Sequence, residues 1–325
     1  MQMRKKPFAF LLIALFLPAA GFAFPQGNEP NRGEGEVVVT VLPLRQGADL
    51  PAIAENQLSL KVNGKSAEIA KWERLQGPDA PVQLIVLIDD GARGSLGNQL
   101  SDVAHFIQSL PPSTEVGVAY MDNGLANMAG PLSEDHAATA RELRVPMGQP
   151  GISGSPYFCL SDLAHHWPSR DSKARRVAVT ITNGIDNYEV HYNPEDPYVQ
   201  AAIHDAIRSR ISVYSIFWHG EGFSGGSFYG ANGGQNLLSQ VTAATGGYSY
   251  WQGAGNPVSL QPYFEDLGRR LENQYRLGFT VPLPNGPRMA AMSLRASGTS
   301  ARLVVPQQVF VGYPAAWTHE ASEGN

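Results

Sequence analysis

The central part of the chain alternates between short apolar runs and apolar residues at helical spacing. Residues 83–88 form an apolar run that ends at Asp89-Asp90-Gly91, which is typical of a parallel strand covered on both faces. Residues 96–110 then carry apolar side chains three or four positions apart, up to Pro111-Pro112. This order of strand, loop and helix predicts the first unit of an α/β fold.

The same alternation continues as far as residue 274. It predicts strands at 115–121, 177–182, 211–218 and 247–251, and helices at 133–143, 158–167, 197–208, 235–244 and 257–274. Such a pattern indicates an open, mostly parallel, Rossmann-like sheet with helices on both faces.

Both ends of the chain show strand patterns without helices. Residues 36–42 are predicted to form a strand, and residues 57–75 alternate around Asn63-Gly64, a strong hairpin signal. Further short strands are predicted near the other end, at 275–281, 290–296, 302–305 and 309–312. We expect the two ends to pair into a small β appendage.

The first 23 residues have the pattern of a secretory signal peptide. Arg4, Lys5 and Lys6 precede an apolar stretch at 8–17, and small residues lead to a cleavage point after Ala23. No later stretch has the roughly 18 apolar residues needed to cross a bilayer, so we expect no transmembrane segment in the mature chain. A periplasmic or secreted location is therefore predicted.

The composition and charge of the chain exclude several kinds of binding site and cross-link. With 43% hydrophobic and 16% charged residues, the chain is expected to fold compactly. The formal net charge of −5 becomes about −8 without the signal residues, so no basic footprint for nucleic acid is expected. The single cysteine, Cys159, excludes an intramolecular disulfide and a cysteine-based zinc cluster.

Function is expected in the loops that follow three of the strands, because ligands of open α/β sheets bind outside the carboxyl ends of the strands. Each of these loops has an unusual sequence. They are Asp89-Asp90-Gly91-Ala92-Arg93 after Ile88, Asn183-Gly184-Ile185-Asp186-Asn187 after Thr182, and a glycine-rich stretch at 219–226 after Trp218.

Four segments, in this order along the chain, resemble the von Willebrand factor type A domain and, more closely, the related bacterial family described from acidobacteria. They are Leu87-Ile88-Asp89-Asp90-Gly91, Gly154-Ser155-Pro156-Tyr157, Thr182-Asn183-Gly184-Ile185-Asp186-Asn187 and Thr245-Gly246-Gly247. The resemblance runs from about Val82 to Phe279. Together with the patterns at the two chain ends, it gives four expected parts: a signal peptide at 1–23, an N-terminal β element at 24–81, a von Willebrand A-like domain at 82–281, and a C-terminal β segment and tail at 282–325.

In the parent family these motifs build a metal-ion-dependent adhesion site, in which carboxylate and hydroxyl oxygens hold Mg²⁺. By resemblance, Asp89 matches the first aspartate, Gly91 and Arg93 replace two serines, and Asn183 replaces the later aspartate. These losses predict a degenerate site with no bound metal or other cofactor, and Mg²⁺ at Asp89 is the alternative. If Arg93 points inward, we expect it to pair with Asp89.

The threonine position of that site is left open by the spacing. Either Ser155 or Tyr157 lies in the corresponding region of the chain.

Acidic and aromatic residues crowd the loops after Thr182 and Trp218. Rigid aromatic side chains are enriched at binding hot spots, so these loops predict a rim that captures an unknown protein or peptide. The predicted rim residues are Asp186, Tyr188, Tyr192, Trp218 and Phe223. Calcium binding by the acidic loop is an alternative, although EF-hand spacing is absent and a solvated loop is commoner.

The expected function is thus an exported, non-enzymatic binding module. Two alternatives remain open. Residues 222–226 match G-x-S-x-G, which suggests a serine hydrolase using Ser224, but extra residues separate this match from the preceding strand and from any following helix. A structural component of a periplasmic assembly is the other alternative.

Overall fold

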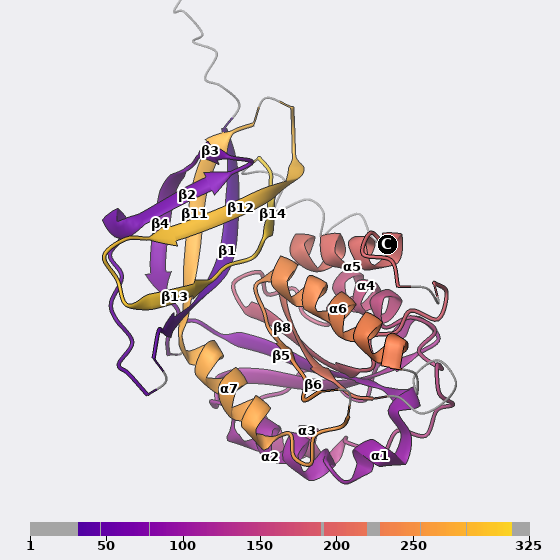
Figure 1. The fold of residues 1–325 in the computed structure, drawn as a ribbon. Coiled ribbons are helices and arrows are strands. Elements are labelled where there is room, and N and C mark those ends of the chain that lie inside the picture. The colour runs from indigo at the N-terminus through magenta and orange to yellow at the C-terminus, as the bar shows by residue number, and fades with distance from the viewer. Residues whose placement is uncertain are drawn as a thin grey trace, which may run out of the picture.

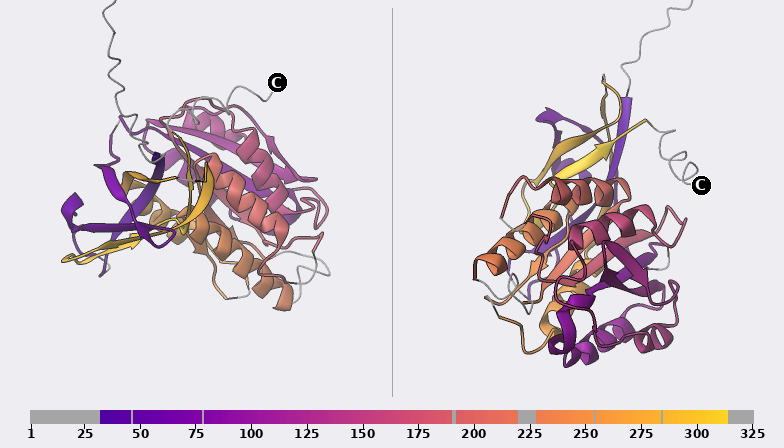
Figure 2. Two further views of the ribbon diagram at one scale, coloured as in Figure 1. Left: turned by 90° about the horizontal axis from the view of Figure 1, so that it is seen from above. Right: turned by 90° about the vertical axis from the view of Figure 1, so that its right-hand side faces the viewer.

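The computed structural model describes residues 32–45, 47–77, 79–189, 192–219, 228–253, 255–283 and 285–313. The predicted signal residues 1–23, together with Phe223 and Ser224, lie outside these ranges. The chain forms a mixed α/β unit around a parallel-rich sheet and a second unit of two antiparallel sheets (Figure 1). The two units lie side by side (Figure 2).

The α/β unit contains a sheet of six strands in the order β10-β9-β8-β5-β6-β7. Five of these strands are parallel, and β7 pairs antiparallel with β6 at one edge, a strand that the sequence pattern did not indicate. The strands are β5 (Val82–Asp89), β6 (Thr114–Asp122), β7 (Leu125–Met128), β8 (Arg175–Thr182), β9 (Ile211–Phe217) and β10 (Ser249–Tyr250).

Helices cover both faces of this sheet because the central strand β5 is apolar on both. Its side chains alternate, so that Leu84 and Val86 face one hydrophobic core while Ile85 and Leu87 face the other. The first core packs against α1 (Arg93–Gly97), α2 (Leu100–Ser109), α3 (His136–Arg141) and α7 (Gln261–Glu272). The second packs against α4 (Pro156–His165), α5 (Pro197–Arg208) and α6 (Phe228–Thr245). The expected sheet with helices on both faces is therefore present in this unit.

The second unit is built from both ends of the chain. One sheet has the order β13-β1-β11-β4 and the other β14-β12-β2-β3, and the two share one apolar core. The strands are β1 (Arg32–Pro43), β2 (Leu58–Val62), β3 (Lys65–Ser66), β4 (Glu68–Arg74), β11 (Gln274–Pro282), β12 (Arg288–Ala296), β13 (Ala301–Val304) and β14 (Gln308–Val311). A one-turn 3₁₀ helix (Glu55–Gln57) precedes β2, and a second (Asp90–Ala92) follows β5 in the α/β unit.

Pairing between the two chain ends is direct. Strand β1 pairs antiparallel with β11 and β13, and β12 pairs antiparallel with β2. At the predicted hairpin, Asn63 and Gly64 have φ values of 48° and 76°, the positive range that a tight hairpin turn requires. Among the described residues, no helix combines the length and apolar character needed to cross a membrane.

Candidate functional site

The carboxylate of Asp89 is the centre of a buried polar network at the carboxyl edge of the parallel sheet. Its Oδ1 accepts a hydrogen bond from the Gly91 N–H at 2.9 Å. Its Oδ2 accepts from the Thr182 hydroxyl at 2.9 Å and from the Ser153 hydroxyl at 3.4 Å. Asp89 ends β5 and Thr182 ends the adjacent parallel strand β8, so the strand register brings these two side chains together.

The environment of Asp89 opposes its negative charge. The residue is only 5% exposed, and burial raises the pKa of its carboxyl group. Hydrogen bonds from Thr182, Gly91 and Ser153 act in the opposite direction, and the nearby charge of Asp90 raises the pKa further. Both Ser153 and Thr182 are 1% exposed, so the network lies inside the protein and not on its surface.

Gly91 leaves little space above this carboxylate. A Cβ atom at this position would lie 3.0 Å from the Gln149 carbonyl oxygen and 3.2 Å from both Asp89 Oδ1 and the Gly151 nitrogen. These distances are tighter than most real Cβ contacts. The resemblance implies a serine at this position in the parent family. In this chain, the backbone of the loop at 148–153 occupies the space that a serine side chain would need.

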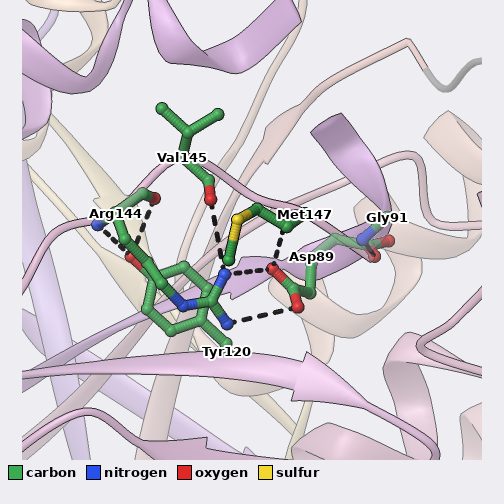
Figure 3. Close-up of polar contacts among 7 residues, drawn as sticks. Asp89, Gly91, Tyr120, Arg144, Val145 and Met147 are labelled. Carbon is green, nitrogen blue, oxygen red and sulfur yellow. Dashed lines mark hydrogen bonds and ion pairs between the residues drawn. The ribbon is translucent and has the colours of Figure 1, made fainter. Parts of the chain in front are cut away.

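Arg144, which Figure 3 shows over the ring of Tyr120, forms an ion pair with Asp90, the residue after the strand end. Its Nη1 and Nη2 contact the two carboxylate oxygens of Asp90 at 2.6 and 3.2 Å. Its guanidinium carbon also lies 3.9 Å from the centre of the Tyr120 ring. Side-chain placement at Arg93, the first residue of α1, lies outside the described structure, so its expected pairing with Asp89 stays a prediction.

The other predicted adhesion-site positions make contacts that do not include Asp89. The Asn183 Oδ1 accepts from the Ile185 N–H at 2.9 Å. Ser155 begins α4, and its hydroxyl oxygen accepts from the Tyr157 N–H at 3.3 Å. The Tyr157 hydroxyl donates to the Gly184 carbonyl oxygen at 2.7 Å. The hydroxyl that does reach Asp89 from this part of the chain belongs to Ser153.

The predicted rim is only partly exposed. Tyr188 and Tyr192 are 63% and 52% exposed, as expected for binding residues. Trp218 was expected at the rim, but this is wrong. It is 2% exposed, belongs to the core beneath α1 and α2, and donates from Nε1 to the Ser95 hydroxyl at 3.1 Å. Asp186 is 1% exposed, so it also cannot contribute exposed surface, and Phe223 lies outside the described residues.

Sequence reasoning missed three residues that contact the two strand-end acids, Asp89 and Asp90. Thr182 was named as a strand end and as the first residue of a segment resembling the parent family, but no contact with Asp89 was predicted for it. A polar residue ending an apolar parallel strand is a signal for this edge. Ser153 and Arg144 carry no local signal, because they lie in irregular segments whose path depends on tertiary packing.

The residues around Asp89 do not fit a magnesium centre of the parent type. Both carboxylate oxygens accept hydrogen bonds, Gly91 supplies no hydroxyl, and the Asn183 side chain is turned to its own loop. Among the described residues there is no group of three or more histidine, cysteine or acidic side chains placed to hold a metal. The arrangement joins three chain segments through hydrogen bonds to Asp89.

A large cavity lies elsewhere, at the opposite end of the parallel strands. It measures about 880 Å³ and is lined by Val82 and Thr114 at the strand starts, by Phe106 and Phe264 on α2 and α7, and by Arg175. Since Asp89 lies at the carboxyl end of β5, this cavity is not part of the candidate site.

No protein-family model and no curated protein match the chain. Among solved structures, it is similar to an aerotolerance-related membrane protein from Bacteroides fragilis, with 13% identity, 58% of this chain and 98% of that chain covered, and a TM-score of 0.41. It is also similar to the pilus adhesin SpaC from Lactobacillus rhamnosus GG in its open conformation, with 9% identity, 84% and 49% coverage and a TM-score of 0.45. A third similarity is to the SpRpn10 VWA domain, with 12% identity, 58% and 95% coverage and a TM-score of 0.38. At these values the similarities carry no information on ligand or partner.

Proposed function

We propose that the protein is an exported, non-enzymatic binding module of von Willebrand A type that captures a protein or peptide at the carboxyl edge of its parallel sheet. The observation that carries this proposal is the exposure of Tyr188 and Tyr192 on the loop after β8, at 63% and 52%. Tyrosine rings bury a large area on binding at little cost in conformational entropy. The loop position agrees with the edge at which open α/β sheets bind ligands.

The proposal includes a degenerate adhesion site, which recognises its partner without a bridging metal. Its support is the hydrogen-bonded state of Asp89 and the ion pair between Asp90 and Arg144. In this arrangement the strand-end acids stabilise the loops, and the exposed tyrosines make the contacts with the partner.

Export is proposed from the signal-like pattern of residues 1–23, and the excess of acidic side chains argues against a nucleic-acid partner. The alternative hydrolase would use Ser224, which lies outside the described residues, and no observation on the described part of the chain favours it.

The test is to capture partners from a periplasmic extract with the mature chain and then measure the affinity of the partner so identified. Tyr192→Ala is expected to weaken binding by about 2 kcal/mol, roughly 30-fold, with little change in melting temperature. Tyr188→Ala should have a similar effect on binding, and some effect on stability, because this ring packs 5.2 Å from Phe158.

The matched control is Tyr248→Ala, which removes an aromatic side chain that is 44% exposed and precedes β10. Its affinity should equal that of the wild type. Unchanged affinity in both rim variants, with the protein still folded, would reject this face as the binding surface.

A further inference from the structure

The cavity at the amino-terminal end of the parallel strands has the size of a small-molecule site. It measures about 880 Å³, within the range of roughly 300–1,000 Å³ that ligand pockets usually have. Phe106 on α2 and Phe264 on α7 line it, with their rings stacked and the ring centres 4.4 Å apart. Other largely buried apolar side chains that line it are Leu75, Ala80, Val82, Leu110 and Leu271. Such walls favour the apolar part of a ligand.

Arg175 brings a positive charge to this cavity, and only neutral groups hold it. Arg175 is the first residue of β8 and lines the cavity. Its Nη1 donates to the Leu271 carbonyl oxygen at 2.9 Å and to the Gln274 Oε1 at 2.6 Å, and its Nη2 donates to the Ala80 carbonyl oxygen at 3.1 Å. No ion pair between described residues includes Arg175. The positive charge is therefore not balanced within the described part of the chain.

The Arg175 guanidinium also has more hydrogen-bond donors than acceptors around it. The three hydrogen bonds use only part of its N–H groups. Its Nε is buried and has no acceptor among the described residues. Burial lowers the pKa of Arg175 to about 10, and the charge of Arg276 lowers it as well. A bound anion would compensate a charge that its surroundings oppose.

The acidic side chains at this cavity do not provide that compensation. The Asp102 Oδ2 accepts from the Ser259 hydroxyl and from the Leu260 N–H, both at 2.7 Å. Glu265 and Glu272 are exposed residues of α7. All three carboxylates line the cavity, and none of them is within ion-pair distance of the guanidinium. The negative charge is therefore left to a ligand.

We propose that this cavity binds an amphiphile of the fatty-acid type, whose carboxylate pairs with Arg175 and whose hydrocarbon chain lies against Phe106 and Phe264. A planar guanidinium suits a carboxylate because it can offer two N–H groups at once. From Phe264 to Leu271, whose carbonyl holds Arg175, α7 rises roughly 10 Å, a distance that a medium-length hydrocarbon chain spans. A small inorganic anion would leave most of the apolar cavity unfilled.

This site is separate from the proposed partner-binding face. Arg175 begins β8, whereas Thr182 ends the same strand and contacts Asp89 at the carboxyl edge. The exposed Tyr188 and Tyr192 follow that edge. Amphiphile binding and partner capture can therefore be tested independently, and failure of one leaves the other standing.

The experiment measures binding of decanoate, decan-1-ol and acetate to the mature chain by isothermal titration calorimetry. Decanoate is expected to bind with a dissociation constant in the micromolar range. Decan-1-ol has the same chain without the charge, so it should bind at least about tenfold more weakly, the loss expected for a hydrogen bond to a charged group. Acetate has the charge without the chain and should give no detectable heat of binding.

Arg175→Gln tests the charge, because glutamine keeps an amide donor for the neighbouring carbonyls. Its affinity for decanoate should fall at least about tenfold, and its affinity for decan-1-ol should stay unchanged. The matched control is Arg295→Gln, which removes the charge of an exposed arginine on β12, and it should bind decanoate like the wild type.

Gly268→Leu tests the cavity without touching Arg175. Gly268 lies on α7 and lines the cavity, and a Cβ atom there would meet no atom within 4 Å. Leucine is also a much better helix former than glycine, so this variant should fold with an equal or higher melting temperature. The leucine side chain should fill space that the ligand needs and weaken decanoate binding at least about tenfold. Gly268→Ala adds only a methyl group and should keep most of the affinity.

Four results would overturn the proposal. Two are a wild-type protein that does not bind decanoate, and a Gly268→Leu variant that binds it with full affinity, which would place the ligand elsewhere. The third is equal affinity of the wild type for decanoate and decan-1-ol, which would reject the role of the Arg175 charge even if Arg175→Gln does not fold. The fourth is acetate binding as tight as decanoate binding, which would indicate a site for small anions.

Discussion

Replacing Asp89 tests whether its carboxylate holds the strand ends together through hydrogen bonds. Asp89→Ala removes the acceptor of the Gly91 N–H and of the Thr182 and Ser153 hydroxyls, at 2.9, 2.9 and 3.4 Å. A buried donor that loses its acceptor costs about 1–3 kcal/mol. Counting the donors of the two shorter bonds at about 1.5 kcal/mol each, we expect the free energy of unfolding to fall by about 3 kcal/mol.

Asp89→Asn is the matched variant, and it should cost less than about 1 kcal/mol, because its carbonyl still accepts from Gly91 and its amide can donate to the two hydroxyl oxygens. The assay is urea unfolding followed by circular dichroism at 222 nm, since the described α-helices all lie in the α/β unit. Equal destabilisation by both substitutions would refute the reasoning, because it would mean that the negative charge itself is required.

The raised pKa of Asp89 predicts how the difference in stability between the wild type and Asp89→Asn changes with pH. A carboxyl group whose pKa is raised in the folded state holds its proton there more tightly than in the unfolded chain. Its stabilising contribution is then fully present below the unfolded pKa of about 3.9 and is lost as pH rises through the higher folded pKa. The stability of the wild type relative to Asp89→Asn should therefore decrease from acid to neutral pH. An increase over that range would contradict the raised pKa.

Two further predictions concern the metal and the β unit. Adding 1 mM Mg²⁺ should not raise the melting temperature appreciably. Binding with a dissociation constant of 10 μM would instead add about 2.7 kcal/mol to the free energy of unfolding. A clear rise that Asp89→Asn abolishes would mean that Asp89 belongs to a functional magnesium site. Ending the chain after Phe279 should make the residues before Val82 sensitive to protease, because β12 and β14 supply Met292, Leu294, Val309 and Val311 to the core beneath β2. Unchanged protease resistance would count against that pairing.

Much of the α/β unit could be predicted from sequence because its strands are buried on both faces. Such strands are nearly continuous apolar runs, and residues 83–88 fall within β5 for this reason. The helices between them show clear apolar periodicity. The exception is the predicted helix over 96–110, which is two helices, α1 and α2, separated at Asn98 and Gln99. Strand β7 carries no such pattern, since its exposed and half-buried residues alternate at the edge of the sheet.

The rim shows why exposure could not be predicted from position alone. Trp218 follows β9 directly at the carboxyl edge, as Tyr188 and Tyr192 follow β8, and the pattern does not distinguish them. Exposure depends on what other segments cover a side chain, and Trp218 is covered by the hydrophobic core that α1 and α2 share with the sheet. The same holds for Asp186, whose burial depends on the packing of the loop and not on its charge.

The amino-acid sequence by itself determined the order of strands and helices, the pairing tendency of the two chain ends and the edge at which function is expected, because these depend on local periodicity and on general rules of parallel sheets. Only the tertiary structure decided which polar groups meet. Ser153 reaches Asp89 across 64 positions, and Arg144 reaches Asp90 across 54. Neither contact has a local signal, since a hydrogen bond between distant segments depends on the path of irregular loops, and that path is set by packing against the whole core.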